Sequence, residues 1–206
     1  MKKWLIGCLS LMVVCLVLML TYMALMRMPN PRTKRIDLGD LIVTRADFPQ
    51  GWVVSGGGPI PGRENQRGSE ETLAIHLRPE GLGEWGASQR IYRYRNAFQA
   101  IDAYFIENAD FFGVRGVSSW QVPADWSYRS PVANRYQFAC AQVSDILGST
   151  TVCVARAQYD EFISVFSTSI DPSYLTYADL ERVLRAIDDR MARALGKPLP
   201  PPATPP

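Results

Sequence analysis

Four cysteines offer the most specific chemistry in this 206-residue chain. Cys8 and Cys15 lie in an apolar stretch, whereas Cys140 and Cys153 lie at equal distances from a turn at residues 146–147. If the flanking segments form a hairpin, this symmetry makes Cys140 and Cys153 directly opposed neighbours, close enough for a disulfide. Such a bond requires an oxidising compartment and would stabilise the fold by about 3 kcal/mol. The alternative is a pair of reduced core cysteines.

Residues that could act in catalysis are few and poorly placed to converge. The single histidine, His76, shares the expected solvent face of a strand with Arg78. Asp160 and Glu161 are adjacent, and adjacent strand side chains point apart, so they make a poor acid/base pair. No serine stands in a Gly-x-Ser-x-Gly elbow, and no Cys-x-x-Cys spacing suggests a metal site. We therefore expect neither an enzyme nor a metal or cofactor; the alternative is a small envelope hydrolase that uses His76.

Aromatic side chains near turns are the better indication of a binding site. Trp85 stands among glycines, Trp120 lies at the end of a predicted strand, and Trp126 and Tyr128 lie close together beyond it. Flat rings of this kind can stack on sugars or on apolar ligands. The alternative is that they close the rim of the core, as we expect of Trp52. These four residues, Trp85, Trp120, Trp126 and Tyr128, are the candidate ligand-binding aromatics.

An apolar run at the N-terminus decides where these residues operate. Residues 4–26 carry no charge, and a helix of 23 residues crosses the hydrocarbon core of a bilayer, which is roughly 30 Å thick. The run is longer than the apolar region of a cleavable signal peptide, and residues 22–24 lack the small side chains of a cleavage site. A lipobox-like segment ending at Cys8 comes too early for lipidation, since no apolar region precedes it. Residues 1–27 are therefore predicted to be an uncleaved anchor, with the lipid bilayer as partner.

The orientation of this anchor depends on two opposing signals. Two lysines precede the apolar run and four basic residues follow it. Because basic residues favour the cytoplasmic side, this distribution alone argues against export of the C-terminal part. A short basic start followed at once by an apolar run nevertheless behaves as a signal anchor that keeps the N-terminus inside. Together with the expected disulfide, this predicts a single-pass protein of the cell membrane with an extracytoplasmic C-terminal domain.

Composition divides the rest of the chain into three parts. Residues 28–36 form a basic linker that stops the membrane helix and could touch anionic headgroups. Residues 37–196 are long enough for one domain, and they contain 15 basic and 20 acidic residues, a net charge of −5 that does not favour nucleic acid. Residues 197–206 contain six prolines and are predicted to be a disordered tail.

Apolar periodicity predicts two helices in the domain. Segment 97–112 places a wide aromatic stripe on one face, and the segment that begins at Thr176 and ends before Gly196 starts with a Thr-x-x-Asp capping pattern. Three consecutive glycines mark a loop over residues 55–68. No Lys-Ser/Thr pair follows them, so we favour a flexible surface loop over a phosphate site.

Alternating apolar residues predict six strands, and the short turns between the last three require antiparallel neighbours. The predicted strands are residues 72–77, 87–95, 114–122, 135–143, 151–157 and 161–168. We therefore expect an α+β fold: a twisted antiparallel sheet with helices packed on one face, preceded by one N-terminal transmembrane helix.

Segment 41–52 reads Leu-Ile-Val-Thr-Arg-Ala-Asp-Phe-Pro-Gln-Gly-Trp, and its Ala-Asp-Phe-Pro-x-Gly-Trp core resembles the opening of many bacterial exported domains, among them lipoproteins and sensor-like modules. A cysteine-bearing hairpin, another strand and a C-terminal amphipathic helix follow, an order similar to the extracellular sensor domain of the mycobacterial serine/threonine kinase H. This resemblance implies an extracytoplasmic α+β module with a disulfide-braced sheet and a cleft. The chain departs from the sensor in having no kinase domain and one soluble cysteine pair instead of two, and no binding residue carries over.

These observations together predict a membrane-anchored extracytoplasmic domain that binds a ligand or an envelope partner without catalysis. Its role would be sensor-like or accessory.

Overall fold

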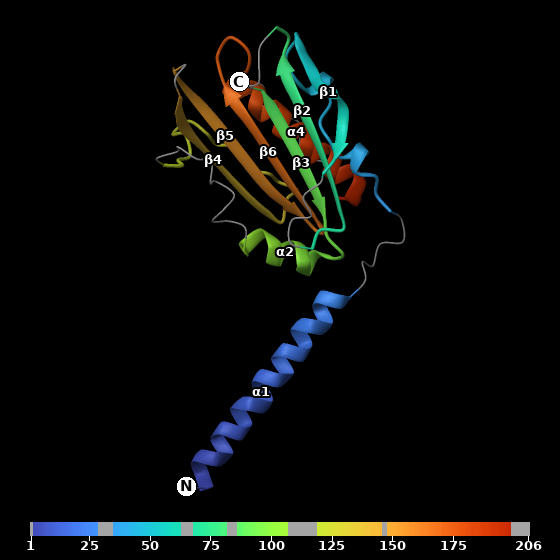
Figure 1. Cartoon of the computed structure of the whole chain (residues 1–206), viewed down its shortest axis with the longest axis vertical. Coiled ribbons are helices and arrows are strands. Elements are labelled where there is room, and N and C mark those ends of the chain that lie inside the picture. Colours follow the sequence, from blue (N-terminus) through green and yellow to red (C-terminus); the bar gives the residue numbers. More distant parts are fainter. Residues whose placement is uncertain are drawn as a thin grey trace.

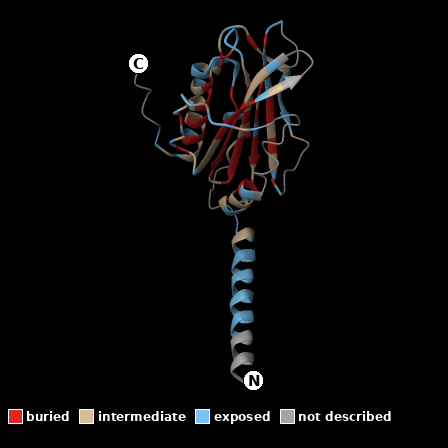
Figure 2. Cartoon of the chain, turned by 90° about the vertical axis from the view of Figure 1, so that its left-hand side faces the viewer, coloured by how far each residue is buried: buried red, intermediate tan, exposed pale blue. Residues whose placement is uncertain are grey.

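The computed structural model describes residues 2–28, 35–62, 68–81, 86–106, 119–145 and 148–198. Helix α1 (Lys2–Arg27) projects from a sheet domain, and its side chains from Ser10 onward are largely exposed (Figures 1 and 2). Its segment Ser10–Arg27 is long and apolar enough to cross a membrane, and no other described helix is. The predicted N-terminal apolar helix is therefore confirmed.

Six antiparallel strands form one twisted sheet in the order β1-β2-β3-β6-β5-β4 (Figure 1). The strands are β1 (Trp52–Pro61), β2 (Glu71–Pro79), β3 (Ala87–Arg93), β4 (Arg135–Asp145), β5 (Gly148–Tyr159) and β6 (Phe162–Ile170). A tight turn joins β5 to β6, where Asp160 adopts a φ of 51°, a left-handed conformation that Asp tolerates better than most residues. The predicted α+β class with an antiparallel sheet is confirmed.

One face of the sheet is covered by α4 (Tyr177–Leu195), and buried residues concentrate between the two (Figure 2). Leu180, Val183 and Met191 are among the buried residues of α4, which share one core with Phe162 and Phe166 of β6. Thr176 and Asp179 form the predicted capping box, and the helix ends at Gly196 in the left-handed conformation that glycine favours.

Helix α2 (Ala97–Ile106) packs against the opposite face, at the end of the sheet nearest α1 (Figure 1). Ala103 and Tyr104 contact a small cluster that includes Tyr92 and Ile163. Because side chains alternate along a strand, Ile163 points away from the face that Phe162 and α4 share. The helices were expected on one face; the structure places α4 on one face and α2 at one end of the other. Residues 107–112 of the predicted helix lie outside the described residues.

Two predicted segments differ from the structure. The loop expected over residues 55–68 is wrong for residues 55–61, which belong to β1 and pair with β2 on both sides of a register shift between Ser55 and Ile60. The glycines at 56–58 all have positive φ values, so they form an irregularity within the strand and do not end it. In the predicted strand 114–122, residues 114–118 lie outside the described residues, and Gln121 forms only an isolated bridge with Cys140.

Candidate functional site

The Cys140–Cys153 disulfide joins the two strands at the edge of the sheet. The cysteines are directly opposed in the β4–β5 pairing, as the symmetry about the turn at 146–147 predicts, and their sulfur atoms are bonded. Both side chains are buried against the main core. The disulfide prediction is therefore confirmed, and the bond stiffens the edge strand β4.

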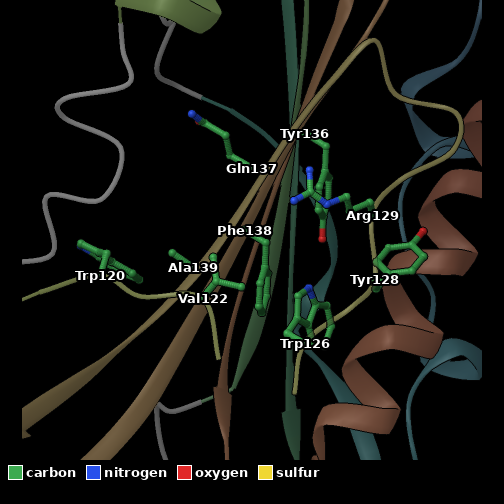
Figure 3. A pocket seen from close by; sticks show the side chains of 9 residues that line it. All are labelled: Trp120, Val122, Trp126, Tyr128, Arg129, Tyr136, Gln137, Phe138 and Ala139. Atoms are coloured by element: carbon green, nitrogen blue, oxygen red, sulfur yellow. The ribbon is translucent and has the colours of Figure 1, made fainter. Parts of the chain in front are cut away.

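A hollow of about 380 Å³ lies beside β4 (Figure 3). It is lined by Trp120, Val122, Trp126, Tyr128, Arg129, Tyr136, Gln137, Phe138 and Ala139. Its volume falls in the range of small-molecule sites. Three of the four candidate aromatics, Trp120, Trp126 and Tyr128, come together here, whereas Trp85 lies outside the described residues.

Aromatic rings form the inner wall of the hollow. Trp126 stacks on Phe138 with ring centroids 4.1 Å apart and planes 20° apart. Tyr128 meets the edge of Trp126 at 6.2 Å and that of Tyr136 at 6.0 Å. Tyr128 and Phe138 are also members of the main core, so these rings both close the core rim and line the hollow. Trp52, by contrast, is buried in the core as expected.

Two polar atoms in this wall, Trp126 Nε1 and Tyr136 Oη, are buried without a full hydrogen bond in the described part of the chain. Gln137 Oε1 is also buried without a partner there, but its side chain leaves the opposite face of β4 and points away from the two rings (Figure 3). Leaving one such atom unpaired costs about 1–3 kcal/mol, and buried polar atoms of folded proteins are almost always paired. The indole N–H of Trp126 points toward the Tyr136 hydroxyl (Figure 3) and acts on it as a weak donor, short of full hydrogen-bond geometry. The aromatic wall therefore presents two donors that a bound molecule could satisfy, and Gln137 offers an acceptor on the other side of β4.

The hydroxyl of Tyr136 is held in its protonated form. Burial raises the pKa of Tyr136, the negative charge of Asp188 raises it further, and the nearby indole N–H of Trp126 partly offsets this rise. A phenol with a raised pKa keeps its proton at neutral pH and can donate it in a hydrogen bond. Tyr136 is thus suited to a carbonyl or hydroxyl oxygen of a ligand.

A second polar network, around Asp188 of α4, holds in place the segment before β4 that carries Trp126 and Tyr128. The buried Asp188 carboxylate accepts hydrogen bonds from Tyr128 Oη at 2.5 Å, Tyr159 Oη at 2.6 Å and Ser130 Oγ at 2.7 Å. Burial raises the pKa of Asp188, although the three hydroxyl donors act in the opposite direction. Arg185 adds its guanidinium over the Tyr128 ring at 4.9 Å. Sequence reasoning missed Asp188, whose only signal is its place beside the apolar stripe of α4.

The hollow also opens onto the free edge of β4. Cys140 exchanges two backbone hydrogen bonds with Gln121, of 2.9 and 2.8 Å, so its backbone groups point away from β5. Phe138 and Tyr136 are two and four residues away from Cys140, and in an antiparallel pair their backbone groups point the same way. No described strand pairs with them on that side. Backbone donors and acceptors are therefore available at the floor of the hollow.

His76 lies on the exposed side of β2, and β2 is separated from β4 by three strands in the order of the sheet. Its cross-strand neighbours are Ser55 and Ser88, and a second hollow of about 290 Å³ places it near Arg90 and Tyr92. Among the described residues, no carboxylate lines that hollow. In the described part of the chain, no group of three or more His, Cys, Asp or Glu residues could hold a metal ion.

Asp160 and Glu161 form the β5–β6 turn and do not approach His76. Asp160 pairs with Lys197 at 3.0 Å, and Glu161 is buried.

No protein-family model, curated protein or solved structure matches the chain. The resemblance to the kinase sensor domain therefore stays a prediction, and the case for a function depends on the geometry of the hollow.

Proposed function

We propose that the chain is a membrane-anchored extracytoplasmic binding domain, sensor-like or accessory in role and without catalysis, which holds its ligand in the hollow beside β4. The anchor is α1, which is long and apolar enough to span a bilayer. The disulfide supports an outward orientation, because such bonds form and persist in oxidising compartments. The role of the domain is to recognise a molecule at the outer surface of the membrane.

The observation that carries this proposal is the pair of buried polar atoms in the aromatic wall, Trp126 Nε1 and Tyr136 Oη, together with Gln137 Oε1 on the other side of the edge strand β4. Trp126 and Tyr136 supply donors, Gln137 supplies an acceptor, and Trp120 and Trp126 supply flat apolar surface. A sugar ring has apolar C–H faces that stack on aromatic rings, and hydroxyl groups that both donate and accept hydrogen bonds. The hollow accordingly fits a carbohydrate better than a purely apolar ligand, which would leave the polar atoms unpaired.

A fluorescence titration of the full chain in detergent micelles tests this proposal. The probes are trisaccharides of N-acetylglucosamine, mannose and galactose, because the aromatic wall does not by itself choose among them. At least one should change the tryptophan emission in a saturable way. Removal of one ring by Trp126→Ala should weaken that binding by about tenfold or more, since each stacked aromatic contributes about 1 kcal/mol or more beyond its area.

Tyr174→Phe is the matched control, since Tyr174 is an exposed tyrosine outside the hollow. It should bind the same sugar with unchanged affinity. A lack of saturable response to all three sugars would overturn the carbohydrate assignment, and equal weakening by Trp126→Ala and Tyr174→Phe would overturn the location of the site.

A further inference from the structure

The end of α1 is fastened to the start of α2 by two side-chain amides. Asn96 Nδ2 lies 2.6 Å from the carbonyl oxygen of Met28 and 3.2 Å from that of Leu25, and Gln99 Nε2 donates to the carbonyl of Met26 at 2.9 Å. The last carbonyls of a helix have no partner within it, so these amides cap α1. Asn96 Oδ1 also accepts the backbone N–H of Gln99 at 3.0 Å, so the same residue caps the N-terminus of α2.

Helix α2 has a second apolar face that the domain does not cover. Ala100 and Ala103 are buried against the sheet, whereas the side chains of Phe98 and Phe105 are 47% and 61% exposed. Residues seven positions apart lie on nearly the same side of a helix, so these two phenyl rings share one face. They are the only exposed phenylalanines among the described residues.

This exposed face is the one directed at α1. Asp102 lies between the two rings on the same side of α2, four residues after Phe98, and it accepts a hydrogen bond from Tyr22 Oη of α1 at 3.2 Å. Figures 1 and 2 show α2 lying crosswise at the end of the domain from which α1 departs. If α1 spans a bilayer, its C-terminal end reaches the bilayer surface, and α2 then lies along that surface with Phe98 and Phe105 toward the lipid.

Positively charged side chains near Phe98 and Phe105 are suited to a lipid surface with anionic headgroups. The guanidinium of Arg135 lies 5.2 Å from the centroid of the Phe105 ring. Arg27 ends α1 between Met26 and Met28, whose carbonyls Gln99 and Asn96 cap, and is exposed. Basic side chains beside apolar ones are the pattern of helices that lie in the headgroup region, and anionic headgroups attract such arginines. The single acidic residue on this face of α2, Asp102, already has Tyr22 as a partner.

We propose that α2 is a second membrane contact, which inserts Phe98 and Phe105 into the surface of an anionic bilayer and so seats the domain on it. This inference rests on the proposed anchoring of α1. The seated domain has a fixed orientation relative to the membrane, because α2 packs against the sheet and α1 is capped by α2.

Depth-dependent quenching in lipid vesicles tests the proposal on the full chain. In a Cys8→Ser, Cys15→Ser background, which keeps the disulfide, an environment-sensitive fluorophore is attached to a new cysteine at Phe105→Cys, Leu16→Cys or Tyr174→Cys. The vesicles are phosphatidylcholine with or without phosphatidylglycerol, and the quencher is placed on the headgroup or at the bilayer centre. Phe98→Cys gives an independent second reading, in case the label at position 105 perturbs α2.

The probes at 98 and 105 should be quenched by the headgroup quencher several-fold more than the probe at 174. That quenching should rise when phosphatidylglycerol is present. A Leu16 probe quenched from the bilayer centre, with probes at 98 and 105 as water-exposed as the probe at 174, would overturn the seating of α2 and leave the anchor intact. A Leu16 probe that escapes quenching would instead overturn the anchoring itself. Equal quenching at 98 and 105 in vesicles with and without phosphatidylglycerol would overturn the assignment to anionic lipid.

Discussion

Two neighbouring groups of buried polar atoms differ in whether their hydrogen bonds are made, although both touch the ring of Tyr128. Around Asp188, the carboxylate takes three hydroxyl donors at 2.5–2.7 Å. In the adjoining hollow, Trp126 Nε1 and Tyr136 Oη make no full hydrogen bond in the described chain. Both groups carry the cost of burial, but only the first offsets a large part of it with hydrogen bonds within the fold. The first therefore holds the structure together, and the second is left for another molecule to complete.

Removal of the Asp188 carboxylate should have the largest effect on stability. Asp188→Ala leaves the hydroxyls of Tyr128, Tyr159 and Ser130 without their acceptor, so we expect the free energy of unfolding to fall by about 3 kcal/mol. Urea unfolding followed by tryptophan fluorescence measures this loss. Asp189→Ala is the control, since Asp189 is only partly buried, and it should change the stability by less than about 0.5 kcal/mol. Equal losses in the two variants would show that the Asp188 network does not hold the fold.

The raised pKa of Asp188 predicts a pH dependence of stability. Because the folded pKa lies above the ordinary value of 3.8, the folded state binds the proton more tightly than the unfolded state. The contribution of Asp188 is thus fully present below pH 3.8 and is lost as the pH rises through the folded pKa. Urea midpoints measured upward from pH 3.8 should show this decline in wild type relative to Asp188→Asn, which does not titrate. Parallel pH profiles for the two proteins would contradict a raised pKa.

A matched pair of tyrosine variants contrasts the two groups of polar atoms directly. Tyr128→Phe removes a hydrogen bond to a carboxylate and should lower the free energy of unfolding by about 1.5 kcal/mol. Tyr136→Phe removes a buried hydroxyl that makes no full hydrogen bond in the described chain, so the stability should stay the same or rise slightly. The same urea experiment measures both. A loss for Tyr136→Phe as large as that for Tyr128→Phe would mean that the hydroxyl of Tyr136 serves the fold and not a ligand.

The sequence predicted those features that depend on local spacing. Cys140 and Cys153 could be paired because both lie at equal distances from one short turn, and strand pairing turns that symmetry into contact. The capping box at Thr176 could be read because both of its partners lie within one helical turn. The aromatics Trp120, Trp126 and Tyr128 were singled out by type, and the structure places them in one hollow.

Features that depend on contacts between distant segments could not be predicted in this way. The glycines at 56–58 signal backbone freedom, which suits either a loop or an irregular strand, and only pairing with β2 decides between them. Periodicity reveals an apolar stripe on α2 but not which side of the helix packs on the sheet: Phe98 and Phe105 of that stripe are exposed, and Ala100 and Ala103 are buried instead. The roles of Asp188 and Tyr136 depend on whether partners from other elements reach them, and no local pattern encodes that.

The most direct test of the central claim is the nuclear magnetic resonance signal of the Trp126 indole N–H, assigned with Trp126→Phe in the full chain labelled with nitrogen-15. The indole N–H of Trp52 serves as an internal reference, because it already donates to the carbonyl of Tyr174 at 3.1 Å in the core. On addition of the three trisaccharides, we predict that the Trp126 signal shifts progressively and saturates for at least one of them, while the Trp52 signal stays in place. A Trp126 signal that does not move with any of them, or that moves only together with that of Trp52, would contradict the assignment of the hollow as the binding site.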